Sequence, residues 1–308
     1  MVAGAHDAQV PAMLIGPVGI GGLGGSGTRV FAALLREAGV HIGSCLNAPL
    51  DNLWFTVLFK RAAWAAGPTP AVPDPEEVAL SLRLFERAMT IGLRGTLSQQ
   101  ELAYLQDIRS TLPPEGDWTP GAKAAQVDHL MSSGPSRPDA PAPWGWKEPN
   151  THVFLPALDT GLSGFRYVHI VRDAFDMAFS GNTWQARHWG HHYGLTRTAD
   201  TPLAHHQLRY WTRANAAALR YGTERMGDRF LLIQYEDFCA RPAEHFARLL
   251  RFLNRDDSLS LPENLVSPST IGRATAHDFT GFAQADLDAA RRLQEEVQHL
   301  SRIGPHRG

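Results

Sequence analysis

Residues 19–29 read GIGGLGGSGTR, and this glycine-rich stretch stands between a short apolar run and an amphipathic segment. The run at 12–20 ends in glycines, which predicts a buried strand. From Ser26 to Ala38 the apolar residues recur on one stripe, which predicts a helix. Glycines at such a turn let the backbone wrap closely round an anion, and the helix N-terminus adds partial positive charge. We therefore predict a loop that cradles the phosphates of a nucleotide.

Other glycine-loop patterns fit these residues less well. A dinucleotide-binding fingerprint lacks the acidic residue expected at the end of a second strand. The Walker A pattern fits in part, because Gly22 and Gly27 are correctly spaced but Thr28 stands where the lysine belongs. That lysine and its magnesium partner do much of the chemistry of an ATPase, so the missing lysine argues against that class. A plain tight turn is the remaining alternative.

The rest of the chain alternates between strand and helix signals. Strands are expected at Val40–Gly43, Phe165–Val171 and Phe230–Gln234, and helices from Asp173, at Ala243–Leu253, at Asp286–Ser301 and in several pieces between about 50 and 131. This order predicts an α/β fold, with a P-loop-type parallel sheet flanked by helices and a largely helical insertion. We expect one domain over residues 1–308, with a flexible 1–11 and a Pro/Ser-rich loop at 132–143.

Composition excludes several classes of protein. The 308 residues carry a formal net charge of −2, so no global field attracts nucleic acid and no nucleic-acid partner is expected. Cys45 and Cys239 are the only cysteines, which argues against a disulfide framework, and together with an N-terminus that lacks a signal pattern they predict a cytoplasmic location. No apolar run approaches the ~18 residues of a membrane span. The sequence leaves a homo-oligomer open.

A second motif lies at the end of the expected strand 165–171. Arg172 ends this strand, Asp173 is placed to cap the next helix, and Ser180 follows eight residues after Arg172. We expect Ser180 two turns along on the same face of that helix, so that arginine and serine grip one phosphate together. The alternative is a structural arginine with a helix serine nearby by chance.

In combination, Ser26-Gly27-Thr28, the Arg172/Ser180 pair and Tyr235-Glu236-Asp237 resemble the sulfotransferases that use 3′-phosphoadenosine 5′-phosphosulfate (PAPS), across roughly residues 12–255. The resemblance implies an enzyme that moves a sulfuryl group from PAPS to a hydroxyl or amine of a small-molecule or carbohydrate acceptor. The product of the donor is then 3′-phosphoadenosine 5′-phosphate (PAP), and no metal is expected. Two alternatives stay open: a P-loop kinase-like phosphotransferase, and a nucleotide sensor without turnover.

The resemblance also implies roles for individual residues. The loop residues Gly24, Gly25, Ser26, Gly27, Thr28 and Arg29 would bind the 5′-phosphosulfate, and Arg172 and Ser180 would bind the 3′-phosphate. Tyr235 and the late basic loop at Gly272 and Arg273 would make further contacts with the donor. Lys147 would lie near the transferring group. The family usually has a lysine just before Ser-Gly-Thr, and here that position is Gly25. Arg29 or Lys147 would have to supply the missing charge.

The transfer also needs a base that takes the proton of the acceptor. Asp51 is the preferred candidate, because in some branches of the family a carboxylate after the second strand serves as base. Glu148 is second and could instead be the salt-bridge partner of Lys147, and His152, expected in the first turn of a helix, is third.

The histidine-rich segment His188, His191 and His192 could indicate a metal site or an acceptor mouth. Adjacent histidines point in different directions on regular elements, and no cysteine or carboxylate completes a ligand set, so we expect no metal. Instead we expect Trp184, Trp189 and Tyr193 to line the acceptor mouth. Trp54, Phe55 and Trp64 are expected to be core residues.

Overall fold

A parallel sheet forms the centre of the computed structural model, which describes residues 16–65, 73–113, 121–135, 143–255, 259–262, 265 and 271–303. Its strands are β1 (Val18–Gly22), β2 (Gly145–Lys147), β3 (Arg166–Val171) and β4 (Phe230–Gln234), in the order β2-β1-β3-β4. All neighbouring strands are parallel, so their carboxyl ends share one edge. The predicted α/β fold with a parallel sheet is confirmed.

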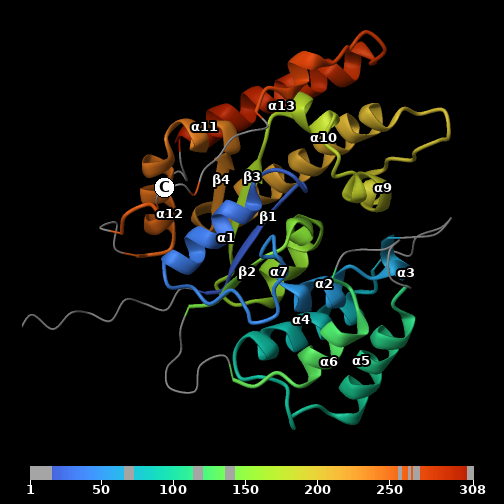
Figure 1. Cartoon of the computed structure of the whole chain (residues 1–308), viewed down its shortest axis with the longest axis vertical. Coiled ribbons are helices and arrows are strands. Elements are labelled where there is room, and N and C mark those ends of the chain that lie inside the picture. The colour runs from blue at the N-terminus through green and yellow to red at the C-terminus, as the bar shows by residue number, and fades with distance from the viewer. Residues whose placement is uncertain are drawn as a thin grey trace, which may run out of the picture.

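Helices cover both faces of this sheet, and each face has its own apolar core (Figure 1). Val168 and Ile170 point to one face, where α1 (Thr28–Glu37), α11 (Tyr235–Ala240) and α12 (Pro242–Phe252) pack. Tyr167 and Val171, which alternate with them, point to the other face. That face is covered by α7 (Leu155–Gly161), α10 (Leu203–Tyr221) and α13 (Gln284–Ile303).

A helical insertion between α1 and β2 lies on one side of the sheet (Figure 1). It consists of α2 (Leu53–Phe59), α3 (Ala62–Ala65), α4 (Pro75–Met89), α5 (Gln99–Thr111) and α6 (Ala124–Met131). Trp54, Phe55 and Trp64 are buried in it, as predicted. The Asn52 side chain caps α2 by accepting hydrogen bonds from the amides of residues 54 and 55. This cap fixes the chain immediately after Asp51.

The remaining elements are short, and most connect strands to longer helices. They are the 3₁₀ helices Pro149–Phe154, Gly190–Tyr193, Gly227–Arg229 and Arg273–Ala276, the π-helix Gly222–Met226, and the helices α8 (Ala174–Ala178) and α9 (Trp184–Trp189). Within the described residues, no helix is both long enough and apolar enough to cross a bilayer.

Two predictions about local structure are wrong. Val40–Gly43 is not a strand, because only His41 bridges to Trp144 before the backbone turns at Gly43, where φ is +100°. Ser180 is not on a helix face, because α8 ends at Ala178. The strand β2 was not predicted at all, since three residues between proline-rich segments leave no apolar pattern. The segments 1–15 and 136–142, which contain the expected flexible end and most of the expected loop, lie outside the described residues.

Candidate active site

The glycine loop turns the chain from β1 into α1 through left-handed backbone conformations. Gly25 has φ +99°, and Gly27, the N-cap of α1, has φ +85°. The Ser26 amide donates to the Leu23 carbonyl at 2.9 Å, which closes the turn. A β-carbon on Gly27 would fall 2.2 Å from a ring carbon of Tyr235, so only glycine fits there. The loop therefore has the narrow backbone cradle that phosphate groups require at a helix N-terminus.

Arg172 reaches this loop from the end of β3. Its Nη1 donates to the Gly25 carbonyl at 3.2 Å, and its guanidinium lies 5.6 Å from the centre of the Tyr235 ring. It also pairs with Asp176 at 3.4 Å and lies 3.9 Å from Glu236. Arg172 and Tyr235 are both predicted to bind the donor. Arg172 contacts the glycine loop at Gly25, and Tyr235 lies against Arg172 and Gly27.

Asp176 connects the late basic segment to the same point. Its two carboxylate oxygens accept from the amides of Gly272 and Ala274, both at 2.8 Å. The start of the 3₁₀ helix Arg273–Ala276 is therefore anchored to the ion-pair partner of Arg172. Sequence reasoning missed Asp176, although its spacing of four residues from Arg172 is a signal for an ion pair on one helical turn.

Ser180 also borders the loop, although it arrives by a turn and not on a helix. Its hydroxyl oxygen would lie 3.2 Å from a β-carbon placed on Gly25. The same oxygen accepts from the Asn182 amide at 3.2 Å, which fixes its direction. Gly25, Arg172 and Ser180 therefore lie together, and a cradle that a β-carbon would fill beside a guanidinium and a hydroxyl fits the phosphate groups of PAPS.

Asp51 and Lys147 form an ion pair on the other side of β1. The Lys147 ammonium lies 2.5 Å from the Asp51 carboxylate and also donates to the Pro49 carbonyl at 2.9 Å. Asn47 donates to the second carboxylate oxygen at 2.8 Å. The pair forms because the Asn52 amide donates to the carbonyl of Lys147, which ties the chain after Asp51 to the end of β2.

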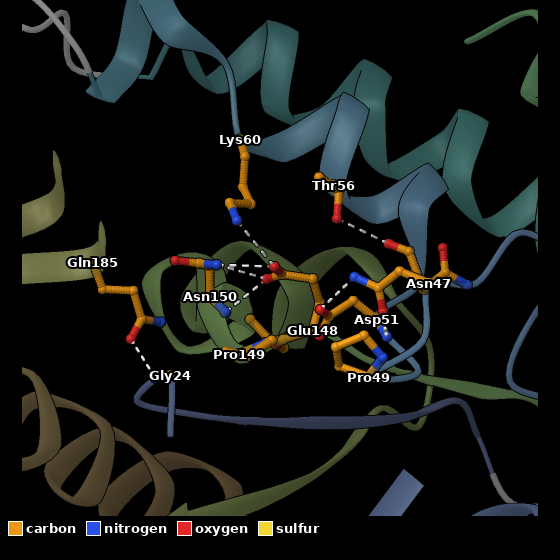
Figure 2. A network of polar contacts seen from close by, with 12 residues as sticks. Gly24, Asn47, Pro49, Asp51, Thr56, Lys60, Glu148, Pro149, Asn150 and Gln185 are labelled. Carbon is orange, nitrogen blue, oxygen red and sulfur yellow. Dashed lines mark hydrogen bonds and ion pairs between the residues drawn. The ribbon is translucent and has the colours of Figure 1, made fainter. Parts of the chain in front are cut away.

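Glu148 is not the partner of Lys147, contrary to the alternative considered above. Its carboxylate lies 3.5 Å from the Lys60 ammonium and accepts three hydrogen bonds from Asn150 (Figure 2). Burial raises the pKa of Glu148, and the negative charge of Asp51 raises it further, against the opposing effect of Lys60. Two carboxylates, each with its own lysine, therefore lie near one another.

His152 lies deeper than these carboxylates. One ring nitrogen lies 2.8 Å from the Pro149 carbonyl and the other 3.3 Å from the Tyr210 hydroxyl. Burial lowers its pKa to about 4. A histidine with both nitrogens engaged inside the protein has no open path to an acceptor, so the geometry favours the carboxylates as base.

An open cavity of about 550 Å³ joins the glycine loop to these carboxylates. Most of the residues that line it are of polar types, and the full lining comprises Gly24, Asn47, Pro49, Asp51, Thr56, Lys60, Glu148, Pro149, Asn150, Gly181, Asn182, Thr183, Trp184, Gln185, Arg187 and His188. Figure 2 shows Gly24, Asp51, Lys60 and Gln185 arranged around this space. His152 is not part of the lining.

The aromatic mouth expected around the histidine segment is only partly present. Trp184 and His188 line the cavity, but Trp189 is fully buried and donates to Asn150, and Tyr193 is not in the lining. The Trp184 ring already has the Lys60 ammonium 4.2 Å from its centre. In the part of the chain that the structure describes, no group of three or more His, Cys, Asp or Glu side chains is arranged to hold a metal ion.

Lys60 and Gln185 are functional candidates that sequence reasoning missed. Lys60 immediately follows α2, and its position in the basic pair Lys60-Arg61 after a helix of apolar residues is a weak signal. Gln185 gives no local signal, because its contact with Gly24 joins residues 161 positions apart in the chain.

Comparison with known proteins identifies one family. The family model described as "Sulfotransferase family" matches residues 17–258. A sulfotransferase domain from the curacin biosynthetic pathway is 17% identical, with 86% of this chain and 81% of that one covered and a TM-score of 0.40. Sulfotransferase STF1 from Mycobacterium tuberculosis H37Rv is 16% identical, with 94% and 78% covered and a TM-score of 0.41. Sulfotransferase STF9 from Mycobacterium avium is 15% identical, with 93% and 77% covered and a TM-score of 0.43. A search of curated proteins found no match.

Proposed function

This chain belongs to the sulfotransferase family and is a transferase enzyme, and from that premise we propose that it moves a sulfuryl group from PAPS to a hydroxyl or amine of a small-molecule or carbohydrate acceptor. One observation carries the proposal: Gly24 of the glycine loop and the carboxylate of Asp51 line the same cavity. A donor on the loop and a base across the cavity are the two parts that sulfuryl transfer requires. A cytoplasmic location and the absence of a metal requirement are part of the same proposal.

The donor side of the proposal uses the loop and the end of β3. Apart from the Ser26 amide, which closes the turn, the backbone amides of residues 25–29 and the N-terminus of α1 would face the 5′-phosphosulfate. Arg172 and Ser180, which meet at Gly25, would hold the 3′-phosphate through charge-assisted and hydroxyl hydrogen bonds. PAPS, when bound, supplies a sulfuryl group already activated by its link to phosphate.

The acceptor side of the proposal uses Asp51 and Lys147. As the bond between acceptor oxygen and sulfur forms, the bond between sulfur and the phosphate oxygen breaks, and the acceptor proton passes to the Asp51 carboxylate. Lys147, 2.5 Å away, keeps a positive charge beside that carboxylate and next to β1. This charge can stabilise the negative charge that develops during the transfer. Gly25, which stands where the family usually has a lysine, cannot do so.

The side chains that line the cavity can orient an acceptor. Most of them are amides, hydroxyls or charged groups, and the ring of Trp184 is already in contact with Lys60 and with His188, whose ring centre lies 4.6 Å away. These polar groups can hold the hydroxyl groups of an acceptor by hydrogen bonds.

The test is a turnover screen with the full chain. PAPS labelled with ³⁵S is incubated with matched acceptors, namely sugars, phenols and aliphatic alcohols, and mass spectrometry detects a sulfate-sized gain in the product. We expect transfer that depends on PAPS and gives PAP. ATP with magnesium, run in parallel, should give no phosphorylated product. Phosphoryl transfer from ATP without sulfuryl transfer would assign the chain to the kinase-like alternative, and PAP binding without turnover on any acceptor would assign it to the sensors.

A further inference from the structure

Gln185 holds the first corner of the glycine loop through both ends of its side-chain amide. Its Oε1 accepts from the Gly24 amide at 2.6 Å, and its Nε2 donates to the Gly22 carbonyl at 3.4 Å. The side chain is buried, with the residue 5% exposed. A buried amide that bridges a carbonyl and an N–H two residues apart continues the hydrogen bonding of β1 beyond its last residue. Gln185 thus fixes where the loop begins to turn.

The residues before Gln185 lie along the same loop. A β-carbon on Gly24 would fall 2.5 Å from the Asn182 side chain, and one on Gly25 would fall 3.2 Å from the Ser180 hydroxyl. The segment 180–185 therefore contacts the loop at Gly22, Gly24 and Gly25. A side chain at Gly24 would collide with Asn182, so the loop and this segment are packed directly against each other there.

Helix α9, which carries Gln185, also forms part of the acceptor side of the cavity. Trp184 and His188 are on this helix and line the cavity. The Trp184 ring contacts the Lys60 ammonium, and Lys60 pairs with Glu148. One short helix therefore contacts the loop through Gln185 and the acceptor cavity through its neighbours.

We infer that Gln185 is a positioning residue that couples the donor loop to the acceptor cavity. This inference rests on the proposed function, because it takes the loop as the donor site. By holding the Gly24 amide and the Gly22 carbonyl, Gln185 sets the direction of the loop amides that follow. Any displacement of α9 caused by an acceptor is transmitted to the loop through this amide, and by reciprocity donor binding biases α9.

Two substitutions separate positioning from simple support. Gln185→Leu removes both hydrogen bonds and leaves the Gly24 amide buried without an acceptor, so the dissociation constant for PAP should rise between about 5-fold and 100-fold. Gln185→Glu keeps an oxygen for the Gly24 amide but adds negative charge beside an anion site. It should therefore weaken the binding of PAP more than Gln185→Leu does, and this loss of affinity should be smaller in high salt.

Hydrogen exchange of the loop amides should rank the two variants in the opposite order, with Gln185→Leu affected more than Gln185→Glu. In Gln185→Leu the amides of residues 22–27 should exchange at least about tenfold faster than in wild type. In Gln185→Glu they should stay close to wild type, because the Gly24 bond is kept. Asn215→Leu is the matched control, since Asn215 is a buried amide with two hydrogen bonds that does not touch the loop. It should lower the melting temperature and leave both loop exchange and PAP affinity unchanged.

A double-mutant cycle tests the coupling itself. Trp184→Leu alters the cavity side of α9 and leaves both loop hydrogen bonds of Gln185 in place, and it should weaken PAP binding severalfold in wild type but not in the Gln185→Leu background. Additive losses would overturn the coupling, and unchanged loop exchange in Gln185→Leu would overturn the positioning role. If wild type binds no PAP, the donor assignment fails separately. In that case, the exchange rates of the loop amides in the Trp184→Leu and Gln185→Leu single and double variants still test the inference.

Discussion

Arg172 and Asp176 form a buried ion pair in which Nη2 lies 3.4 Å from the carboxylate, and the two side chains are 5% and 2% exposed. The same carboxylate accepts from the amides of Gly272 and Ala274. Arg172 therefore neutralises a buried anion that anchors a neighbouring segment, and it also contacts the glycine loop. Its contributions to stability and to donor binding have to be measured separately.

Arg172→Ala should lower PAP affinity and stability together. Losing a hydrogen bond to a charged group costs about 1.5–3 kcal/mol, so PAP should bind more than tenfold more weakly, while ADP, which has no 3′-phosphate, should be little affected. Leaving Asp176 buried without its partner should cost about 3–5 kcal/mol of unfolding free energy. Titration calorimetry with both ligands and urea unfolding check the two effects.

The double variant Arg172→Ala with Asp176→Asn is the control for that experiment. It removes the unpaired charge, so it should recover part of the stability but none of the preference for PAP over ADP. Equal losses of affinity for PAP and ADP in Arg172→Ala would show that Arg172 does not recognise the 3′-phosphate.

Gly27→Val should abolish PAP binding and leave a cooperative, lower thermal transition. The new β-carbon would collide with the Tyr235 ring, and valine strongly disfavours the left-handed conformation at φ +85°. Gly95→Val is the matched control, because Gly95 has φ +74° but no atom within 4 Å of its would-be β-carbon. It isolates the cost of backbone strain. PAP affinity retained in Gly27→Val would mean that the loop is only a turn.

The sequence predicted the parts of the site that depend on local patterns. The glycine loop, the strand that ends just before Arg172 and the Asp173 cap of α8 all follow from periodicity and capping within about ten residues. The sequence pattern could not predict how Ser180 reaches the loop. Helix α8 stops after five residues, and a turn then brings the Ser180 hydroxyl to Gly25.

Long-range contacts account for the rest of what was missed. Lys60 meets Glu148, and Gln185 meets Gly24, across separations that no periodic pattern encodes. Val40 and Ile42 gave the apolar signal of a strand because both are buried against α1 and the sheet, but their segment pairs with the chain before β2 only at the bridge from His41 to Trp144. Burial produces the same apolar signal in a strand and in a packed loop.

Acid should destabilise the protein through its buried histidines. The pKa of His152 is about 4 in the folded state against 6.5 when exposed, so below pH 6.5 the unfolded chain binds more protons. Stability is therefore present above pH 6.5 and is lost as the pH falls towards 4, by about 3 kcal/mol from this residue. Burial lowers the pKa of His169 to about 3, and its effect has the same sign.

Urea unfolding across that pH range checks this prediction. The slope of unfolding free energy against pH should be smaller in His152→Gln than in wild type, by up to one proton, or about 1.4 kcal/mol per pH unit. His129, which lies in α6 and shows no such burial, supplies a control in His129→Gln. An unchanged slope in His152→Gln would mean that His152 does not stay neutral in the folded protein.

Chelation should leave activity intact. A sulfuryl group carries less negative charge than a terminal phosphate, so lysine and backbone amides can stabilise its transfer without a divalent ion. We expect dialysis against EDTA to keep the rate within about twofold, a margin well below the 10²-fold worth of a catalytic group. Loss of activity on chelation that zinc then restores would favour a metal at the His188, His191 and His192 segment.

Asp51→Asn should slow turnover while the donor still binds. The substitution keeps the size of the side chain, but it removes the charge that pairs with Lys147 and that, in the proposed mechanism, accepts the acceptor proton. The catalytic rate should fall about 10²–10⁴-fold, the usual effect of losing a positioned base. PAP affinity should stay within a few-fold of wild type, because the proposed donor contacts lie on the loop side of the cavity.

Variants at the neighbouring groups identify Asp51 as the base or exclude it. Glu148→Gln should reduce the rate much less, because the Glu148 carboxylate is already engaged by Lys60 and by three hydrogen bonds from Asn150. His152→Ala should also have a smaller effect, since that ring faces Pro149 and Tyr210 and not the cavity. Lys147→Ala should slow turnover and also weaken PAP binding, because it removes the positive charge beside Asp51 that the proposed mechanism uses. A near-normal rate in Asp51→Asn, with a large loss in Glu148→Gln, would transfer the role of base to Glu148 and leave the donor assignment untouched.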